Sequence, residues 1–186
     1  MNSMITFMLL TMVALLGCQS PADTGQEEPA RANVRYTAAT GNQQRPDNPY
    51  YSRTDTARLE LADSTWRRVL PADVYQIARR KGTERAFTGQ YWNHTGLGTY
   101  YCGACGNALF RSDAKFASDC GWPSFFEVLR KNGVSYQDDH SYGMERIEVL
   151  CGRCDAHLGH LFDDGPPPTG KRYCMNSIVL DFEPGL

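Results

Sequence analysis

Hydrophobic and polar positions divide the chain into three parts. Residues 4–17 are almost continuously apolar, residues 19–48 are dominated by Pro, Gly, Gln, Asn and charged side chains, and the rest alternates short apolar runs with turn residues. The first part is shorter than the roughly 20 residues that a membrane-spanning helix needs. Its length is typical of the apolar core of a signal peptide. We therefore expect residues 1–17 to be a signal peptide.

The polar second part predicts a linker. It contains too few large apolar side chains to offset the entropy cost of ordering it. We expect a flexible linker over residues 18–54 and a folded domain over residues 55–186, which is long enough to build one hydrophobic core. The alternative is an N-terminal arm that packs on this domain.

The folded part begins with helical spacing. In residues 70–82 apolar side chains recur on one helical face, Pro71 suits a first turn, and Gly82 suits the end of a helix. Beyond Gly89, runs of about five residues rich in Tyr, Phe and Val alternate with Gly, Asn and Asp, which is typical of antiparallel strands. The predicted strands are residues 98–102, 107–111, 133–137, 146–151, 157–162 and 171–182. The expected fold class is mainly β, with antiparallel sheets in a small barrel-like or sandwich-like core and short N-terminal helices.

Charge excludes one class of function. The net charge of the whole chain is -2 at neutral pH. This near-neutral balance lacks the excess of Lys and Arg that nucleic-acid-binding proteins use. Nucleic acid is therefore not an expected partner.

The signal sequence ends in a motif for lipid attachment. The residues LLGC place a small residue directly before Cys18, which resembles the lipobox of bacterial lipoproteins. The resemblance implies lipidation of Cys18 and a protein that is exported to the bacterial periplasm or cell envelope and anchored to a membrane. The alternative is an ordinary secretory signal with an incidental cysteine. This alternative stays open for two reasons. No Lys or Arg precedes the apolar run, and Leu16 is larger than the residue usual at this position of a lipobox.

Four of the seven cysteines form two matched pairs. Cys102 and Cys105 lie in CGACG, and Cys151 and Cys154 lie in CGRCD. Two C-x-x-C turns supply four thiolates, which suit a tetrahedral structural Zn²⁺ that clamps two hairpins, one ion per chain. A disulfide within each pair is one alternative. A thioredoxin-like redox pair is another, although both pairs sit in glycine turns between strands rather than at the start of a helix.

Besides Cys18, two cysteines are left. Cys120 lies in the glycine-proline turn SDCGWPSFF, and Cys174 lies in the predicted strand 171–182, on the same face as Asn176. Three interpretations stay open at this point. The thiol at 174 could be reactive at the edge of a site, it could pack as a small apolar residue, or it could form a fixed disulfide with Cys120.

Two histidines follow the second cysteine pair. His157 and His160 would face opposite sides of a regular strand, but Gly159 between them permits a bulge that turns both towards one cleft. An imidazole beside a thiol can stabilise the thiolate and can donate a proton to an oxygen leaving group. As zinc ligands they are superfluous, because four cysteines complete the shell. The alternative is that they are packed polar residues.

Long motifs in the folded part resemble one family. GTERAFTGQYW, YYCGACGNALF, CGWPSFFE and GMERIEVLCGRCDAHLGHLFDDGPPPTGKRYCMNS are similar, in this order, to the B-type methionine sulfoxide reductases, which act on the R epimer of the sulfoxide. The resemblance covers residues 68–183, essentially the whole folded part.

This resemblance implies a reaction for the two remaining cysteines. Cys174, in RYCMN, would attack the sulfoxide sulfur and become a sulfenic acid. Cys120 would then form a disulfide with it, which a thioredoxin-like reductant reopens. The substrate would be methionine sulfoxide in oxidised proteins or peptides, and the enzyme would act as a monomer in the repair of oxidative damage.

The resemblance also implies roles for neighbouring side chains. Trp122 would be the wall for the substrate methyl group, His157 and His160 the active-site histidines, and one of them the proton donor. Asn176 would donate a hydrogen bond to the sulfoxide, or alternatively only satisfy a neighbouring strand. Arg172 would supply positive potential near the thiol, or alternatively be a solvated charge at a strand end.

One position departs from the family pattern. Asp119 stands where glycine commonly precedes the recycling cysteine, and its charge is expected to raise the pKa of Cys120. Two competing functions stay open: a membrane-tethered zinc-ribbon binding module without chemistry, and a disulfide oxidoreductase that uses one C-x-x-C pair.

Overall fold

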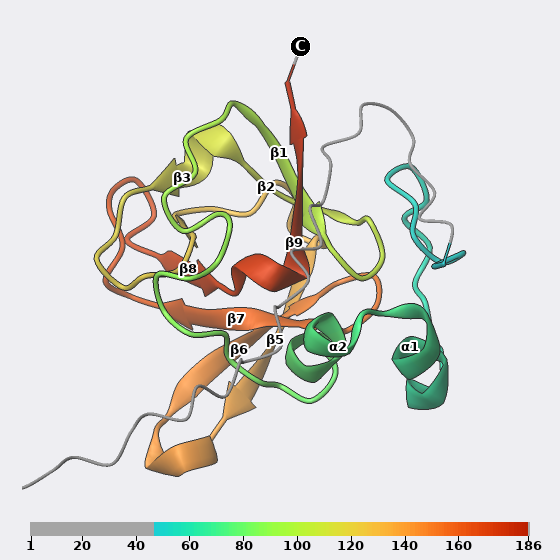
Figure 1. Cartoon of the computed structure of the whole chain (residues 1–186). Coiled ribbons are helices and arrows are strands. Elements are labelled where there is room, and N and C mark those ends of the chain that lie inside the picture. Colours follow the sequence, from blue (N-terminus) through green and yellow to red (C-terminus); the bar gives the residue numbers. More distant parts are fainter. Residues whose placement is uncertain (1–46, 186) are drawn as a thin grey trace, which may run out of the picture. The chain divides into compact units, whose positions relative to one another are not determined.

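Two antiparallel sheets form the framework of residues 47–185, the part of the chain that the computed structural model describes (Figure 1). The smaller sheet has the strand order β2-β1-β9 and the larger sheet the order β3-β4-β8-β7-β6-β5. The strands are β1 (Gly98–Cys102), β2 (Ala108–Arg111), β3 (Lys115–Phe116), β4 (Ser124–Phe125), β5 (Val134–Asp139), β6 (Arg146–Cys151), β7 (His157–Phe162), β8 (Arg172–Met175) and β9 (Leu180–Pro184). The expected signal peptide over 1–17, the lipidation of Cys18 and the linker as far as residue 46 lie outside the described residues and stay predictions.

The mainly β fold with short N-terminal helices is confirmed, but neither sheet closes into a barrel. β2 and β9 are the edges of the smaller sheet, and β3 and β5 are the edges of the larger one. Aromatic rings join the sheets. Phe110 of β2 stacks on Phe125 of β4 with ring centroids 4.3 Å apart, and Tyr100 of β1 meets the same ring edge-on at 5.0 Å. These rings are fully buried and form the centre of the core.

Local patterns predict most of the strands. β1, β6 and β7 have the predicted bounds, and β2 and β5 differ from their predictions by one or two residues at an end. β3 and β4 were not predicted, because a strand of two residues is too short to show a period.

The predicted strand 171–182 is wrong as a single element. After β8 the chain leaves the larger sheet, makes one 3₁₀ turn, η3 (Ser177–Val179), and joins the smaller sheet as β9. The break depends on a contact with a residue that is distant in the sequence. The backbone N–H groups of Ser177 and Ile178 donate to the carboxylate of Glu84 rather than to a neighbouring strand. This turn carries the chain from one sheet to the other.

Two short helices, α1 (Asp63–Val69) and α2 (Ala72–Ala78), lie side by side and precede the sheets in the sequence (Figure 1). α2 falls within the predicted range 70–82, with Pro71 at its N-cap, and its apolar face packs on β7 and η3. α1 contributes the fully buried Trp66 to the core. Across residues 47–185, no helix combines the length and the apolar character needed to cross a bilayer.

The packed structure begins earlier than the composition predicts. Asn48 is 2% exposed, and its side-chain amide donates to the carbonyl oxygen of Ala104 at 2.8 Å. Tyr51 is equally buried, and its hydroxyl donates to the Asp181 carboxylate at 2.6 Å. Residues 48–57 therefore form an arm packed on the domain, although residues 48–54 were expected to belong to the flexible linker.

Candidate active site and metal centre

The four paired cysteines come together at the ends of two hairpins. Cys102 ends β1 and Cys105 follows in the next turn, and Cys151 ends β6 and Cys154 follows in an equivalent turn. All four are buried free thiols, and their sulfurs lie within 4.8 Å of one another. The closest pairs join the two turns, Cys102 with Cys154 at 3.8 Å and Cys105 with Cys151 at 3.6 Å. A tetrahedron with Zn–S bonds of about 2.3 Å has S–S edges of about 3.8 Å, so this cluster has the geometry to hold a zinc ion.

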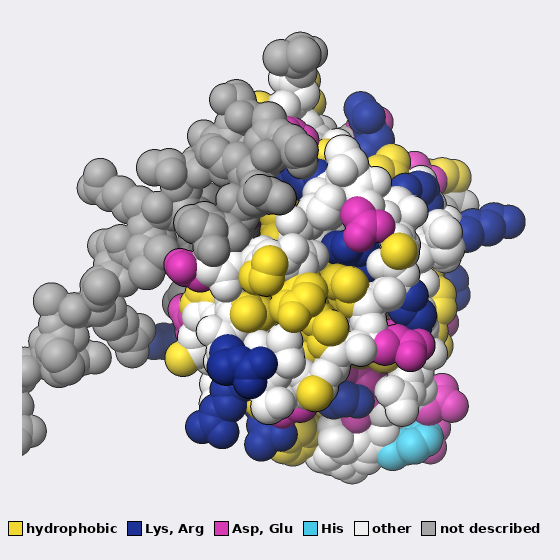
Figure 2. Space-filling model, turned by 90° about the vertical axis from the view of Figure 1, so that its right-hand side faces the viewer, with side chains coloured by type: hydrophobic (Ala, Val, Ile, Leu, Met, Phe, Trp, Pro, Cys, Tyr) yellow, Lys and Arg dark blue, Asp and Glu magenta, His cyan; other side chains and the backbone are white. Residues whose placement is uncertain are grey.

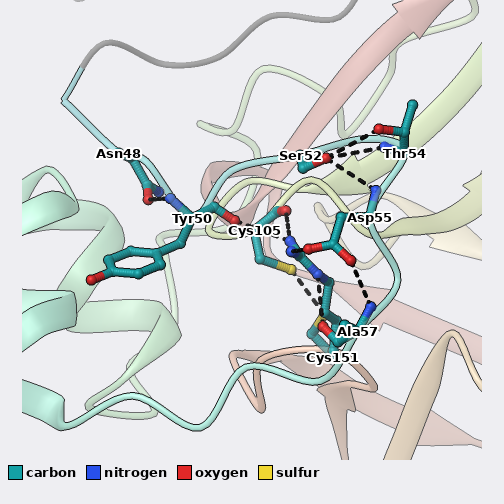
Figure 3. Close-up of polar contacts among 9 residues, drawn as sticks. Asn48, Tyr50, Ser52, Thr54, Asp55, Ala57, Cys105 and Cys151 are labelled. Atoms are coloured by element: carbon teal, nitrogen blue, oxygen red, sulfur yellow. Dashed lines mark hydrogen bonds and ion pairs between the residues drawn. The ribbon is translucent and has the colours of Figure 1, made fainter.

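The arm is fastened to the metal centre by Arg153, which lies between the two cysteines of the second turn. Arg153 is 3% exposed, and its guanidinium pairs with the Asp55 carboxylate at 2.6 Å. It also donates to the backbone carbonyl oxygens of Tyr50, Ala57 and Cys105. Figure 3 shows how the arm curves around Cys105. Because the planar guanidinium satisfies several acceptors at once, it holds the arm and both cysteine turns in one arrangement.

The two remaining cysteines, 54 positions apart in the sequence, meet in the structure. Cys174 lies on β8, Cys120 lies in the turn before β4, and their Sγ atoms are 3.6 Å apart. The strand register places Ser124 of β4 opposite Cys174 on one side and His160 of β7 opposite it on the other. Side chains directly opposite in antiparallel strands share a face. Cys174 therefore stands between a hydroxyl and an imidazole.

These two thiols differ in their affinity for a proton. Hydrogen bonds from Cys174, Ser118 and Ser124 lower the pKa of Cys120 to about 4, although burial acts in the opposite direction. The hydrogen bond to Cys120 and burial raise the pKa of Cys174, while the charge of Arg172 lowers it. Because the two sulfurs are 3.6 Å apart, the thiols lose their protons as a pair, and their surroundings favour the negative charge on Cys120 over Cys174.

The expectation that Asp119 raises the pKa of Cys120 is not met in the net shift. The pKa of Cys120 falls, because the hydrogen bonds made to its sulfur outweigh burial. Asp119 is exposed, and water screens the charge of an exposed carboxylate.

Cys174 opens into a pocket of about 110 Å³. Trp122 lines it and is held there by a hydrogen bond from its indole Nε1 to the carbonyl oxygen of Glu84 at 3.2 Å. The pocket is also lined by Thr83, Arg146, His160, Phe162 and Asn176. An apolar ring faces polar groups here, so the pocket can distinguish the apolar end of a small ligand from its polar end.

The two histidines line one cleft, as expected, but only one of them borders the cysteine pocket. A register shift in the pairing of β6 with β7 lets His157 and His160 both reach a cleft of about 590 Å³. His160 also lines the pocket at Cys174, and its Nε2 lies 2.8 Å from the Asp139 carboxylate. His157 is buried with its Nδ1 2.6 Å from Glu148, and burial lowers its pKa.

Gly159 brings the strands of the site close together. A side chain at this position would lie against the backbone carbonyl oxygen of Cys174 on β8. Only a residue without a Cβ atom allows β7 to approach β8 in this way, and this approach sets His160 directly opposite Cys174.

Arg172 is held by a bidentate ion pair. Its Nε and a terminal nitrogen are each 2.8 Å from the carboxylate oxygens of Asp164, and its guanidinium lies over the ring of Phe162 at 4.4 Å. Because its charge lowers the pKa of Cys174, Arg172 contributes to the potential at the thiol and is more than a solvated strand-end charge.

Asn176 is engaged by the backbone on both sides of its amide. It is 3% exposed, its Oδ1 accepts a hydrogen bond from the N–H of Glu84 at 3.0 Å, and its Nδ2 donates to the carbonyl oxygen of Leu158 at 3.1 Å. Asn176 therefore satisfies neighbouring segments, as in the alternative interpretation, and because it also lines the pocket, its hydrogen bond to the ligand stays a prediction.

Comparison with known proteins agrees with this arrangement. The family model described as the SelR domain matches residues 70–184, which include both cysteine turns, Cys120 and Cys174. The chain belongs to the B-type methionine sulfoxide reductases. The match confirms the resemblance that the motifs indicated. The members of this family are oxidoreductases.

Three relatives are at least half identical to this methionine sulfoxide reductase over about two thirds of its length. The peptide methionine sulfoxide reductase MsrB of Thiobacillus denitrificans is 56% identical over 122 residues, which cover 66% of this chain and 92% of the relative. The MsrB of Azotobacter vinelandii is 51% identical over 127 residues, 68% of this chain and 96% of the relative. The MsrB of Methanosarcina barkeri is 50% identical over 125 residues, 67% and 88% of the two chains.

Several side chains that complete the site in this reductase were not singled out from the sequence. Ser118 and Ser124 had a usable signal, because both hydroxyls lie within four positions of a candidate cysteine. Glu84 and Glu148 had none, since each contacts its partner only through the fold.

Proposed function

We propose that this chain reduces the R epimer of methionine sulfoxide, mainly in oxidised proteins and peptides, to methionine, with Cys174 as the nucleophile. One observation carries the proposal. The sulfur of Cys174 opens into a pocket that Trp122 and His160 also line, and the sulfur of Cys120 lies 3.6 Å away from it. A nucleophile, a proton donor, a wall for an apolar group and a second thiol are thus together at one place.

The first half of the reaction transfers oxygen to Cys174. The thiol passes its proton along the hydrogen bond to the Cys120 thiolate, and Arg172 stabilises the new charge at Cys174. The Cys174 thiolate attacks the sulfoxide sulfur while His160, directly opposite, protonates the departing oxygen. The attack forms a bond between the two sulfurs and breaks the bond between the substrate sulfur and its oxygen, which departs as hydroxide. The hydroxide adds to the sulfur of Cys174, and the bond between the two sulfurs breaks. Its electron pair stays on the substrate sulfur, which leaves as methionine. Cys174 loses these two electrons and becomes a sulfenic acid.

The second half restores the thiols. The sulfur of Cys120 attacks the sulfenic sulfur of Cys174, forms a disulfide and releases the oxygen as water. A disulfide bond is about 2.05 Å long, so the two sulfurs have to approach by roughly 1.5 Å. A thioredoxin-like dithiol then reduces the disulfide by exchange and is itself oxidised.

Selection of one epimer follows from the two sides of the pocket. In the sulfoxide, a methyl group and an oxygen differ in polarity but little in size. The ring of Trp122 offers an apolar surface for the methyl group, and His160 offers a donor for the oxygen. The other epimer would exchange the two groups and place the oxygen against the ring without a hydrogen bond.

The metal centre is structural in this proposal. Cys102, Cys105, Cys151 and Cys154 would hold one zinc ion, which supplies a crosslink between the two turns and takes no part in the reaction. The four sulfurs are fully engaged with one another and buried, whereas the reacting pair is partly exposed. This difference in exposure supports a structural metal site at the four buried cysteines and the reaction at Cys120 and Cys174.

The test uses both epimers of a methionine sulfoxide peptide with dithiothreitol as the reductant. The native protein should reduce only the R epimer, and Cys174→Ser should be inactive. Turnover of neither epimer would favour a zinc-ribbon binding module. Reduction that survives Cys174→Ser would move the chemistry to another thiol, as in an oxidoreductase that uses a C-x-x-C pair.

Recycling through Cys120 is tested with Cys120→Ser. With thioredoxin this variant should complete one turnover and then stall, because the sulfenic acid has no neighbouring thiol to condense with. Dithiothreitol, a small thiol that reaches the pocket directly, should sustain its cycling. Undiminished turnover with thioredoxin would remove Cys120 from the recycling role.

We also propose that the protein is exported, carries lipid on Cys18 and acts as a monomer at a membrane of the cell envelope. The LLGC motif and the polar stretch after it support this proposal. Mass spectrometry of the mature N-terminus should find a lipidated Cys18. An unmodified N-terminus, or cleavage elsewhere, would contradict it, and a dimer in size-exclusion chromatography would contradict the monomer.

A further inference from the structure

Glu84 connects the two sides of the cysteine pocket, although it does not line the pocket itself. Its side chain reaches the end of β8, where one carboxylate oxygen accepts the N–H of Ser177 and the other accepts the N–H of Ile178. These two N–H groups belong to the turn in which the chain leaves the larger sheet. The carboxylate therefore fixes the position at which the strand of Cys174 ends.

The backbone of the same residue contacts the pocket on both sides. Its N–H donates to Oδ1 of Asn176 at 3.0 Å, and its carbonyl oxygen accepts the indole N–H of Trp122 at 3.2 Å. Asn176 is the second residue after Cys174, and Trp122 is the second residue after Cys120. One residue thus links the segments that carry the two reacting sulfurs.

The carboxylate of Glu84 is held without a cation. Among the described residues no Lys, Arg or His forms an ion pair with it, and its partners are the two backbone N–H groups. Burial raises its pKa, while the two hydrogen bonds lower it. A half-buried charge without a counter-ion costs stability. We therefore look for a role of this carboxylate in the geometry that its two hydrogen bonds impose on the turn after β8.

The surroundings leave the side chain little freedom. A Cβ atom added to Gly89 would meet both the side chain of Ser177 and a carboxylate oxygen of Glu84. The hydroxyl of Ser177 in turn accepts the N–H of Tyr91. Residues 84–91 therefore wrap around the turn after β8, and Glu84 is the point at which this wrapping segment also contacts Trp122.

We propose that Glu84 is a positioning residue that sets the separation between the Trp122 wall and the strand of Cys174. This inference rests on the proposed function, because the separation matters only if a substrate methyl group has to fit between them. Glu84 then determines how well the sulfoxide binds and how well its epimers are distinguished. It leaves the chemistry of the thiol unchanged.

Glu84→Gln tests the proposal, with Glu127→Gln, at an exposed position, as the matched control. A glutamine amide offers one acceptor oxygen for two N–H groups, so one of them loses its partner and the turn shifts. For the R epimer with dithiothreitol, we expect KM to rise about tenfold, which corresponds to about 1.4 kcal/mol, and kcat to stay within about twofold. The preference for the R over the S epimer should fall, and Glu127→Gln should behave as the native protein.

A second measurement separates positioning from a general loss of structure. In a double-mutant cycle of Glu84→Gln with Trp122→Phe, which removes the indole N–H, the effects on KM should be less than additive, because both act through one wall. Additive effects, a fall in kcat at unchanged KM, or an unchanged KM in Glu84→Gln would overturn the inference. If Glu84→Gln does not fold, Glu84→Asp replaces it in the same comparison. A native protein that is inactive on both epimers would overturn the proposed function, and this inference with it.

Discussion

At the scale of single residues, the position of one proton decides how the site responds to a substrate. The hydroxyls of Ser118 and Ser124 lie within hydrogen-bond distance of the sulfur of Cys120 and lower its pKa. The pKa of Cys174, next to this sulfur, is raised. In the proposed reaction, Cys174 therefore starts as a thiol and becomes the nucleophilic thiolate when its proton moves to Cys120.

The proton distribution predicts which cysteine reacts first with an alkylating reagent at about pH 6. Cys120 has a pKa of about 4 and is a thiolate there, so iodoacetamide should modify it before Cys174, whose pKa is raised. Peptide mass mapping of the labelled protein measures the order. Ser118→Ala should move the labelling of Cys120 to higher pH, and Ser64→Ala, at an exposed position, should not. Earlier labelling of Cys174 would contradict the charge assignment.

The two histidines should respond differently to replacement by Asn. His160→Asn should lower kcat by about 100-fold, because it removes the proton donor opposite Cys174. His157→Asn should mainly lower the free energy of unfolding, because the buried Glu148 loses its imidazole partner. Steady-state kinetics with dithiothreitol and thermal unfolding of both variants measure these effects. Equal losses of kcat would refute the assignment of proton donation to His160.

At the scale of elements, patterns that are local in the sequence predicted most of the strands. The bounds that were predicted wrongly depend on contacts between residues that are distant in the sequence. The bounds of β1, β6 and β7 follow from apolar runs between turn residues. The end of β8 could not be predicted in this way, because it depends on Glu84, 93 positions before Ser177. The packed arm escaped prediction for the same reason, since its polar composition gives no sign of Arg153, 98 positions after Asp55.

The residues of the candidate site divide in the same way. The spacing of the C-x-x-C pairs predicted a cluster of four cysteines, and the family motifs singled out Cys174 and Cys120, whose sulfurs the structure brings together. The hydrogen-bond partners of Asn176 could not be predicted, because they come from segments that no local pattern connects. The net fall in the pKa of Cys120 could not be predicted from Asp119, because it depends on hydrogen bonds made to the sulfur.

The fastening of the arm predicts a link between folding and metal retention. Arg153→Lys keeps the charge but removes the planar donor set, so we expect the free energy of unfolding to fall by about 3 kcal/mol. Metal should also leave the protein faster in the presence of a coloured chelator. Chemical unfolding and chelator-competition kinetics measure the two effects. Arg58→Lys, at an exposed ion pair, serves as the control and should change neither. A stable Arg153→Lys variant with normal metal release would show that the arm is dispensable.

At the scale of the whole molecule, the six cysteines within residues 47–185 separate into two sets with different exposure. The metal set is fully buried between two hairpin turns, and the reacting pair is partly exposed at a pocket of the larger sheet. Because buried thiols are poorly accessible to oxidants, the two chemistries can coexist in one domain.

This separation predicts the outcome of a single turnover without any reductant. Incubation of the reduced protein with excess R sulfoxide should remove two titratable thiols per chain, those of Cys120 and Cys174, and should release no metal. Thiol titration in denaturant with a chelator, together with metal quantification before denaturation, measures both quantities. Loss of more than two thiols, or release of metal, would show that the buried set takes part.

Natural variation in this enzyme should be restricted at a position that carries no reacting group. At Gly159 a methyl group would meet the carbonyl oxygen of Cys174 and push β8 away from β7. Cys174 and His160, the proposed nucleophile and proton donor, sit on those two strands, so even alanine would separate them. Saturation of Gly159 should therefore abolish activity with every substitution, while the partly buried Leu161, which does not line the pocket, should accept other apolar side chains.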